Sequence, residues 1–196
     1  RKENFDRRGK SRLLTFEDIS KLGDELAKET VKYAKAPGIL SGIQKYARGD
    51  YKKINGTIRK RGIEWAPGDV QDLNKAAANH SLPEGTILYR GISPEVYNKV
   101  FSKLTEGKEI EVKGLQSTSI SLSVASNWGA DQLAKSSDVP FVLEIESKKG
   151  LFIGDMGGQK PESEVVQASG TKYKYLGSEE IKKGVMKVRI VKVQEV

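Results

Sequence analysis

Two glutamates close together near the C-terminal end of the chain have the residue types to do chemistry. Glu162 and Glu164 flank Ser163, after the Gly-rich stretch 154–161 and before the apolar pair Val165-Val166. If a strand begins here, residues two apart point to the same side, so both carboxylates face one space. Paired carboxylates repel each other unless a cation, a developing positive charge or a nucleophile's proton lies between them. An acidic loop end in water is the plain structural alternative.

A second polar segment, Leu88-Tyr89-Arg90-Gly91, ends a predicted strand. An arginine at such a place offers its planar fork to a phosphate or a carboxylate. The glycine after it lets a ligand approach the backbone. Taken alone, the segment is equally compatible with an arginine on a solvated edge strand.

A third segment, Gln116-Ser117-Thr118-Ser119, places three hydroxyl groups on one predicted strand. Ser117 and Ser119 share one face of that strand, and Thr118 points to the other. Small hydroxyl residues leave room for a ligand and can hold a carboxylate in position by donating to it. A solvated strand is again the plain alternative.

Composition excludes several other chemistries. The chain has no cysteine, so disulfides, thiolate catalysis and cysteine-ligated zinc are excluded. His80 is its only histidine, which excludes a histidine-based triad and a multi-histidine metal site. No metal is therefore expected.

The chain is basic, with a formal net charge of +8 over 196 residues. This charge suits nucleic acid, an acidic protein, anionic lipid or a phosphorylated small molecule, and by itself favours none of them. No run of about 18 apolar residues predicts a membrane span. The charged start of the chain has no apolar stretch, so no signal peptide is expected.

The order of elements predicts an α+β fold, because helical patterns come first and strand patterns follow. We expect a flexible basic arm over residues 1–14 and a single domain over 15–196, helical over 15–82 and mainly β over 83–196. The first expected helix begins at Phe16 and is ended by Pro37-Gly38. The other expected helices are 39–47, 51–60, 69–79, 94–103 and 123–135. The expected strands are 86–90, 109–112, 115–120, 141–145, 151–153, 164–168, 172–176 and 185–193.

An arginine, a Ser-Thr-Ser strand and a Glu-x-Glu pair, in this order, resemble the Arg–Ser–Glu branch of the ADP-ribosyltransferase family. That branch includes iota-type binary toxins, Rho-modifying exoenzymes and vertebrate arginine-specific transferases. Tyr46, followed by Tyr51 to Arg59, is similar to the Tyr-x-x-Ile-Asn-x-x-Leu-Arg segment on the N-terminal helices of iota-type enzymes, with Ile58 in place of Leu. Trp128 and the run 170–174 also match, so the resemblance extends from about residue 40 to the end.

The resemblance implies N-terminal helices packed on a two-sheet β core, with a cleft between the sheets that binds NAD as co-substrate without a metal. Cleavage of the bond from ribose to nicotinamide builds positive charge on the ribose, as in glycoside cleavage. By analogy with the family, Glu164 stabilises that charge and Ser117 orients Glu164. The remaining NAD contacts are assigned to Arg90, Gly91, Thr118, Ser119, Trp128, Tyr51 and Asn55.

Glu162 occupies the position whose residue type, in this family, correlates with the kind of acceptor that is modified. A glutamate there, rather than glutamine, goes with arginine as the modified residue. A carboxylate can bind the guanidinium fork and take a proton during attack. Two departures concern phosphate binding: Gly91 replaces a second arginine, and Asp131 stands where an arginine is common.

The leading interpretation is a mono-ADP-ribosyltransferase that modifies an arginine of a host target protein, as a domain of a bacterial toxin or phage effector. Such a domain would be secreted or injected into a target cell, act in its cytoplasm and have an immunity protein as a further partner. One alternative keeps the chemistry with DNA or RNA as acceptor, and another is an NAD glycohydrolase, with water as acceptor. A third is a basic binding module without catalysis.

Overall fold

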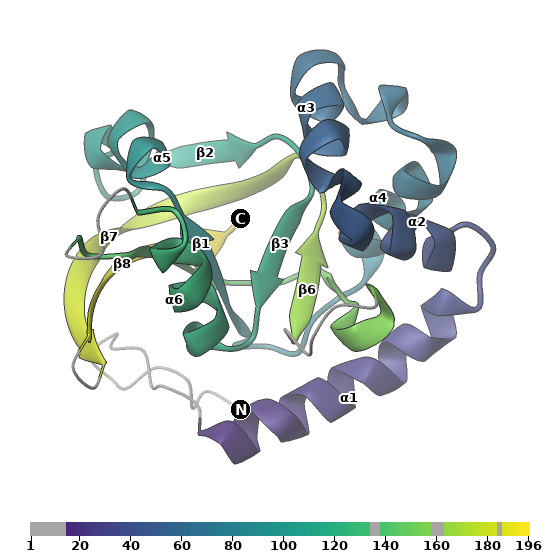
Figure 1. The fold of residues 1–196 in the computed structure, drawn as a ribbon, viewed down its shortest axis with the longest axis horizontal. Coiled ribbons are helices and arrows are strands. Elements are labelled where there is room, and N and C mark those ends of the chain that lie inside the picture. The colour runs from purple at the N-terminus through teal and green to yellow at the C-terminus, as the bar shows by residue number, and fades with distance from the viewer. Residues whose placement is uncertain (1–14, 134–137, 158–162, 184–185) are drawn as a thin grey trace.

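The computed structural model describes residues 15–133, 138–157, 163–183 and 186–196 (Figure 1). Six α-helices and eight strands lie in these ranges. The helices come first in the chain and the strands follow, with two shorter helices between the first strands. The predicted α+β class is confirmed.

The N-terminal part is helical. It comprises α1 (Phe16–Ala34), α2 (Ile39–Lys45), the π-helical turn η1 (Tyr46–Asp50), α3 (Tyr51–Arg61), the 3₁₀ turn η2 (Ile63–Trp65) and α4 (Gly68–Asn79). Helix α1 begins with a capping box. The hydroxyl of Thr15 accepts from the amide of Asp18 at 3.1 Å, and the Asp18 carboxylate accepts from the amide of Thr15 at 3.0 Å.

The rest of the described chain is mainly strands. They are β1 (Ile87–Ile92), β2 (Glu109–Val112), β3 (Gln116–Ser119), β4 (Phe141–Glu146), β5 (Leu151–Phe152), β6 (Glu164–Gln167), β7 (Thr171–Lys183) and β8 (Met186–Glu195). The helices α5 (Pro94–Lys99) and α6 (Leu122–Ala130) and the 3₁₀ turns η3 (Phe101–Lys103) and η4 (Gly154–Gly157) lie between them. Strand order is β2-β7-β8-β4-β1-β3-β6-β5, with β4 and β8 parallel and the other pairs antiparallel.

The sheet consists of two halves that meet where β1 pairs with β3. In the described chain, β1 and β3 are paired through one residue pair, in which Tyr89 lies opposite Ser119. By comparison, β1 and β4 are paired along six residues. The two sheets implied by the resemblance are thus two halves of one strand order, joined through a short contact.

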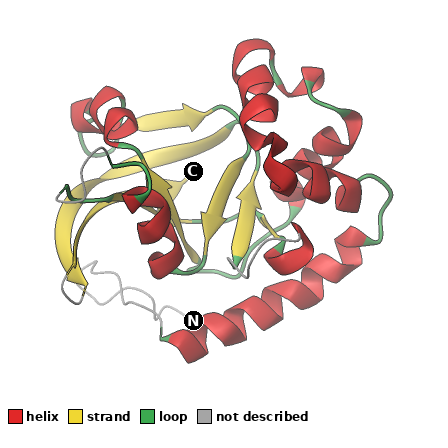
Figure 2. Cartoon of the chain, viewed as in Figure 1, coloured by secondary structure: helices red, strands yellow, loops and turns green. Residues whose placement is uncertain are grey.

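Helices cover each half separately (Figure 2). Helices α2 to α4 pack on the β3-β6-β5 half through a cluster that includes Ile43, Leu73, Leu115 and Val166. Helix α6 packs on the half that contains β1, β4 and β8. A third cluster draws on both halves and on Leu26 of α1. Buried apolar side chains from three clusters therefore pack around the junction of the two halves.

Two element boundaries differ most from the sequence prediction. The helix predicted to reach residue 135 ends at Ala130, and residues 134–137 lie outside the described ranges. The strand predicted to end at Leu176 continues to Lys183, past a bulge at Gly177, whose φ is 120°. A glycine at a bulge lets the strand bend and then resume pairing, so the polar run after it still forms a hairpin with β8.

Among the residues that the structure describes, no helix has the length and apolar character that crossing a bilayer requires.

Candidate functional site

The candidate site begins at the pairing of β3 with β6. Ser119 lies opposite Glu164, and Ser117 lies opposite Val166. Opposite residues of an antiparallel pair project to the same face, as do residues two apart on one strand. Ser117, Ser119 and Glu164 therefore share one face of the sheet, and Ser119 is the direct neighbour of Glu164. Ser117 lies diagonal to Glu164 and is half-buried, as Glu164 is.

Thr118 does not lie with these residues. It points to the opposite face, is fully buried, and its hydroxyl donates to the backbone carbonyl of Val165 at 2.6 Å. This bond fixes β3 against β6. The contact between Thr118 and NAD that the resemblance implies stays a prediction, and the observed contact of this side chain is with the backbone of β6.

Arg90 connects the two halves of the sheet. It lies one residue after Tyr89, the residue of β1 that pairs with Ser119. Its Nη1 donates a hydrogen bond to the backbone carbonyl of Ser117 at 2.7 Å. The guanidinium is thus held beside the strand that carries the hydroxyl residues. A guanidinium has five N–H donors, so one such bond leaves several for a ligand.

Gly91 has a packing role that the sequence does not reveal. A Cβ at this position would lie 2.3 Å from the amide nitrogen of Gly129 and 2.6 Å from the carbonyl oxygen of Ala125. Only a residue without a side chain lets α6 approach β1 so closely. The structure therefore accounts for this glycine by helix packing, and its approach to a ligand stays a prediction.

Tyr46 is a residue of this site to which the sequence assigned no role. It is 2% exposed and lies at the start of η1. Its hydroxyl donates to the backbone carbonyl of Leu115 at 3.2 Å and shares a hydrogen bond with Oγ of Ser117 at 3.1 Å. The only signal in the sequence is a tyrosine five residues before Tyr51, in the segment that resembles iota-type enzymes.

The charge environment of Tyr46 joins the same residues. Burial raises the pKa of the Tyr46 phenol above its ordinary value. The pKa of this phenol is lowered by the charge of Arg90 and by hydrogen bonding with Ser117 and Asn55. The charge of Glu164, like burial, raises it. Arg90 and Glu164 are therefore both close enough to influence this hydroxyl.

Asn55 acts as a backbone partner for the start of β3. It is buried, its Oδ1 accepts from the amide of Leu115 at 2.9 Å, and its Nδ2 donates to the carbonyl of Leu115 at 3.0 Å. An amide side chain that bonds both groups of one residue replaces a strand neighbour. Asn55 thus positions the segment that leads to Ser117, two residues later.

The two aromatic residues of the prediction lie on different helices. Tyr51 is exposed on α3, with its ring edge-on to Tyr46 at 6.4 Å between centroids. Trp128 on α6 is partly buried against a cluster that includes Ile87 and Tyr89 of β1. Tyr89 shares a face with Ser119 through their pairing, so Trp128 lies over the same face of the sheet as the hydroxyl residues.

The backbone just before Glu164 is unusual. Ser163 has a φ of 48°, the positive value of a left-handed residue, which costs a residue with a side chain about 1–2 kcal/mol. Two hydrogen bonds hold this segment: Ile120 N to the carbonyl of Ser163 at 3.2 Å, and Ile153 N to the carbonyl of Glu164 at 2.8 Å. Such strained residues cluster at functional sites. Glu162 lies outside the described residues, so its position stays a prediction.

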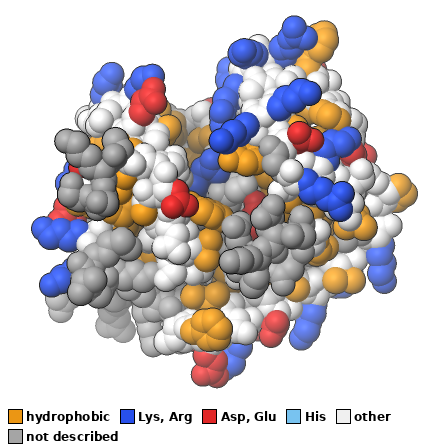
Figure 3. All heavy atoms as spheres, in the orientation of Figure 1, with side chains coloured by type: hydrophobic (Ala, Val, Ile, Leu, Met, Phe, Trp, Pro, Cys, Tyr) orange, Lys and Arg blue, Asp and Glu red, His pale blue; other side chains and the backbone are white. Residues whose placement is uncertain are grey.

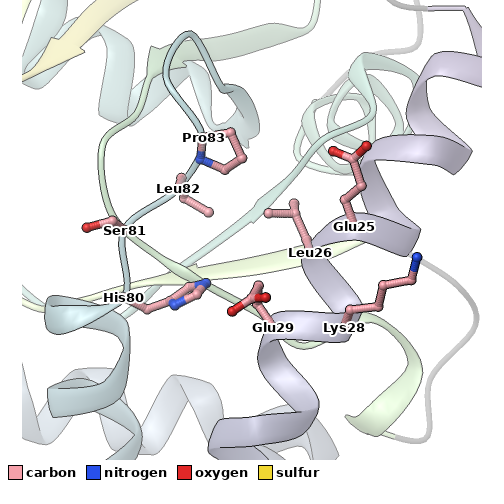
Figure 4. A pocket seen from close by; sticks show the side chains of 8 residues that line it. All are labelled: Glu25, Leu26, Lys28, Glu29, His80, Ser81, Leu82 and Pro83. Atoms are coloured by element: carbon pink, nitrogen blue, oxygen red, sulfur yellow. The ribbon is translucent and has the colours of Figure 1, made fainter.

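One pocket of the molecule lies elsewhere. It has a volume of about 510 Å³ and is lined by Glu25, Leu26, Lys28, Glu29, His80, Ser81, Leu82 and Pro83 (Figure 4). These residues belong to α1 and to the segment between α4 and β1, and none of them is a candidate for catalysis. In the described ranges, no group of three or more His, Asp or Glu side chains forms a possible metal site.

The chain is similar to known proteins in sequence pattern and in fold. The chain matches a family model described as ADP-ribosyltransferase exoenzyme over residues 23–195. C3stau2 from S. aureus, solved with NAD, superposes with a TM-score of 0.70 at 15% identity, covering 94% of this chain and 98% of that one. The Clostridium limosum C3 exoenzyme superposes with a TM-score of 0.69 at 18% identity, covering 95% and 98%.

A third solved structure is BECa of a binary enterotoxin of C. perfringens, determined with NADH. It has a TM-score of 0.69 and 20% identity, over 95% of this chain and 50% of that one. None of the curated protein sequences compared matches this chain significantly. Likeness at such low identity concerns the fold, whereas the family model spans the chain from within α1 to the end of β8. This protein therefore belongs to the ADP-ribosyltransferase exoenzyme family.

Proposed function

We propose that this protein is a mono-ADP-ribosyltransferase that cleaves NAD and transfers ADP-ribose to an arginine of a target protein. The observation that carries the proposal is the pairing of Ser119 with Glu164, which puts a glutamate carboxylate and two serine hydroxyls on one face. The bond from Arg90 to the Ser117 carbonyl adds a cation beside that face. Family membership gives this set of residues its substrate, NAD.

The proposed reaction begins with the bond between ribose C1′ and nicotinamide. The bond's electron pair leaves with nicotinamide, which becomes neutral, and positive charge develops on the ribose. A carboxylate beside this carbon is more favourable in the transition state than in the ground state, and this difference accelerates the reaction. We assign this role to Glu164, held by its strand pairing and by the hydrogen bonds of its backbone neighbours.

The other residues bind and orient. Arg90 would hold the phosphates of NAD, because its fork matches phosphate oxygens. Ser117 would orient Glu164 and is itself held by Tyr46. Trp128 would lie against nicotinamide, and Tyr51 would close over the adenosine side. Asn55 would contribute by fixing the start of β3.

The acceptor in this proposal is an arginine. A nitrogen of the guanidinium attacks C1′, the new C–N bond forms, and the guanidinium proton passes to a carboxylate, for which Glu162 is the candidate. A carboxylate can accept this proton, whereas an amide cannot. As a toxin or phage effector domain, the protein would meet this acceptor in the cytoplasm of a target cell. An immunity protein would protect the producing cell.

The acceptor is tested with labelled NAD and agmatine, a small guanidine compound. We expect label to move to agmatine in the wild type, and the variant Glu162→Gln to lose this transfer while it still hydrolyses NAD. If label moves to added DNA or RNA and remains there after protease treatment, the acceptor is nucleic acid and not arginine. NAD hydrolysis without any acceptor would make the protein a glycohydrolase.

A further inference from the structure

One face of α3 is uniformly cationic. Lys52 and Arg59 lie seven residues apart, as do Lys53 and Lys60, so two helical turns bring each pair to the same side. All four side chains are exposed, on the side opposite the buried Ile54 and Ile58. We call Lys52, Lys53, Arg59 and Lys60 the cationic face of α3. Figure 3 shows Lys and Arg side chains gathered over this helix.

The cationic face of α3 has no acidic partner in the part of the chain that the structure describes. Lysines on other helices pair with an acid one turn away, as in Lys21–Glu17, Lys75–Asp72 and Lys99–Glu95. Helix α3 has no acidic residue, and among the described residues no carboxylate lies within 4.0 Å of the four side chains of this face. Like charges held on one short helix repel each other, so this surface gains stability from an anionic partner.

Exposed aromatic rings stand at both ends of this face. Tyr51 begins α3, and Nζ of Lys52 lies 5.9 Å from the centre of its ring. Trp65 follows the helix and is 60% exposed, with Cζ of Arg61 at 5.2 Å from its ring. Tyrosine, tryptophan and arginine are the residues that dominate binding energy at protein interfaces.

The position of α3 connects this face to the candidate site. The inner side of the same helix carries Asn55, which bonds both backbone groups of Leu115, two residues before Ser117. A helix with its side chains is about 10–12 Å across. A protein bound to the outer side would thus lie about one helix diameter from the strand that bears the hydroxyl residues.

From these observations we infer that the cationic face of α3 docks an acidic surface of the acceptor protein, next to the arginine to be modified. This inference rests on the proposed function, because it names the kind of protein that carries the acceptor. Electrostatic docking of this kind raises the rate of association and weakens as salt increases.

The first test measures binding to two probes, a fluorescent oligoglutamate peptide and an oligothymidine of equal charge. The variant is Lys53→Glu/Lys60→Glu, and the control is Lys103→Glu/Lys108→Glu, which changes the net charge equally at two exposed lysines outside α3. We expect the wild type and the control to prefer the peptide, and the α3 variant to bind it roughly tenfold more weakly. Equal weakening in both variants, or a wild type that prefers oligothymidine, overturns the inference.

The second test separates docking from catalysis. Two peptides with a single arginine, one flanked by glutamates and one by lysines, are compared with agmatine as acceptors of labelled ADP-ribose. We expect the glutamate peptide to be modified roughly tenfold faster than the lysine peptide, and this preference to disappear in Lys53→Glu/Lys60→Glu while agmatine modification is unchanged. Equal rates for both peptides in the wild type overturn the inference. If the wild type does not modify agmatine, the proposed function is overturned. The binding test then still decides whether the cationic face of α3 docks an acidic surface.

Discussion

Nη1 of Arg90 donates a hydrogen bond to the backbone carbonyl of Ser117 at 2.7 Å, from one half of the sheet to the other. The backbones of β1 and β3 pair at Tyr89 and Ser119, one and two residues away from this bond. The side chain of Arg90 thus connects β1 to β3 beyond the one pair of residues whose backbones are paired. The arginine proposed to hold NAD is also the residue that orients the hydroxyl strand.

Replacement of Arg90 by lysine keeps the positive charge and removes the planar fork. We expect Arg90→Lys to raise the KM for NAD about tenfold or more, because a hydrogen bond to a charged group contributes about 1.5–3 kcal/mol. NAD hydrolysis measured over a range of NAD concentrations tests this. Unchanged kinetics in a folded Arg90→Lys protein would remove Arg90 from the NAD site.

Tyr46 links two segments that are 71 residues apart through its hydrogen bond to Ser117. Tyr46→Phe keeps the packing of the ring and leaves the Leu115 carbonyl and the Ser117 hydroxyl with one partner fewer. We expect the free energy of unfolding to fall by about 1 kcal/mol and the rate of NAD cleavage to fall as well. A double-mutant cycle with Ser117→Ala should give a coupling of about 0.5–1.5 kcal/mol in chemical denaturation. Additive effects would show that the contact does not hold Ser117.

Two glycines of the chain predict opposite effects of alanine. At Gly91 a Cβ would lie 2.3 Å from a backbone nitrogen of α6, so Gly91→Ala should lower the free energy of unfolding by about 1–3 kcal/mol. At Gly56 on α3 a Cβ would meet nothing within 4 Å, so Gly56→Ala should raise it by about 0.5–1 kcal/mol. Urea denaturation of both variants measures the difference. A neutral Gly91→Ala would contradict the close approach of α6 to β1.

These residues show what the sequence can and cannot predict. Alternation along a strand correctly put Ser117 and Ser119 on one face, because that depends only on local geometry. It could not tell which of them pairs with Glu164, because register is set by the partner strand and by packing. The structure gives Ser119 the position opposite Glu164, and Ser117 the diagonal one.

Roles that depend on distant parts of the chain were missed for the same reason. Asn55 was assigned a contact with NAD, which stays a prediction, and its hydrogen bonds to Leu115, 60 residues away, were not foreseen. Gly91 suggested an approach to a ligand, and the structure explains it by the packing of α6. The continuation of β7 beyond Gly177 was hidden because its residues are polar and its stability comes from pairing with β8.

The only histidine predicts how stability depends on pH. His80 is 6% exposed, packs edge-on to Tyr33 at 5.0 Å, and lies near Glu29 in the pocket under α1 (Figure 4). Burial lowers the pKa of the His80 imidazole below its ordinary value of 6.5, and the charge of Glu29 opposes this shift. Glu25 and Lys28 also line this pocket, and Lys32 pairs with Glu29.

The sign of the effect follows from proton binding. Below pH 6.5 the unfolded chain gains a proton on His80 that the folded protein does not bind until its lowered pKa is reached. We therefore expect the free energy of unfolding to fall as pH decreases from 6.5 towards that lowered pKa, and to be independent of His80 above pH 6.5. Chemical denaturation between about pH 7.5 and about pH 5.5 measures this slope, and His80→Gln should remove it. An equal slope in the variant would assign it to other groups.

The central claim is that the carboxylate of Glu164 stabilises positive charge on the ribose as nicotinamide leaves. The most direct measurement is the rate of nicotinamide release from NAD by the wild type and by Glu164→Gln, with Glu109→Gln on the exposed end of β2 as control. We expect Glu164→Gln to lower this rate by about 100-fold or more, at unchanged stability, and the control to leave it unchanged. If a folded Glu164→Gln protein releases nicotinamide at the wild-type rate, Glu164 does not stabilise this charge.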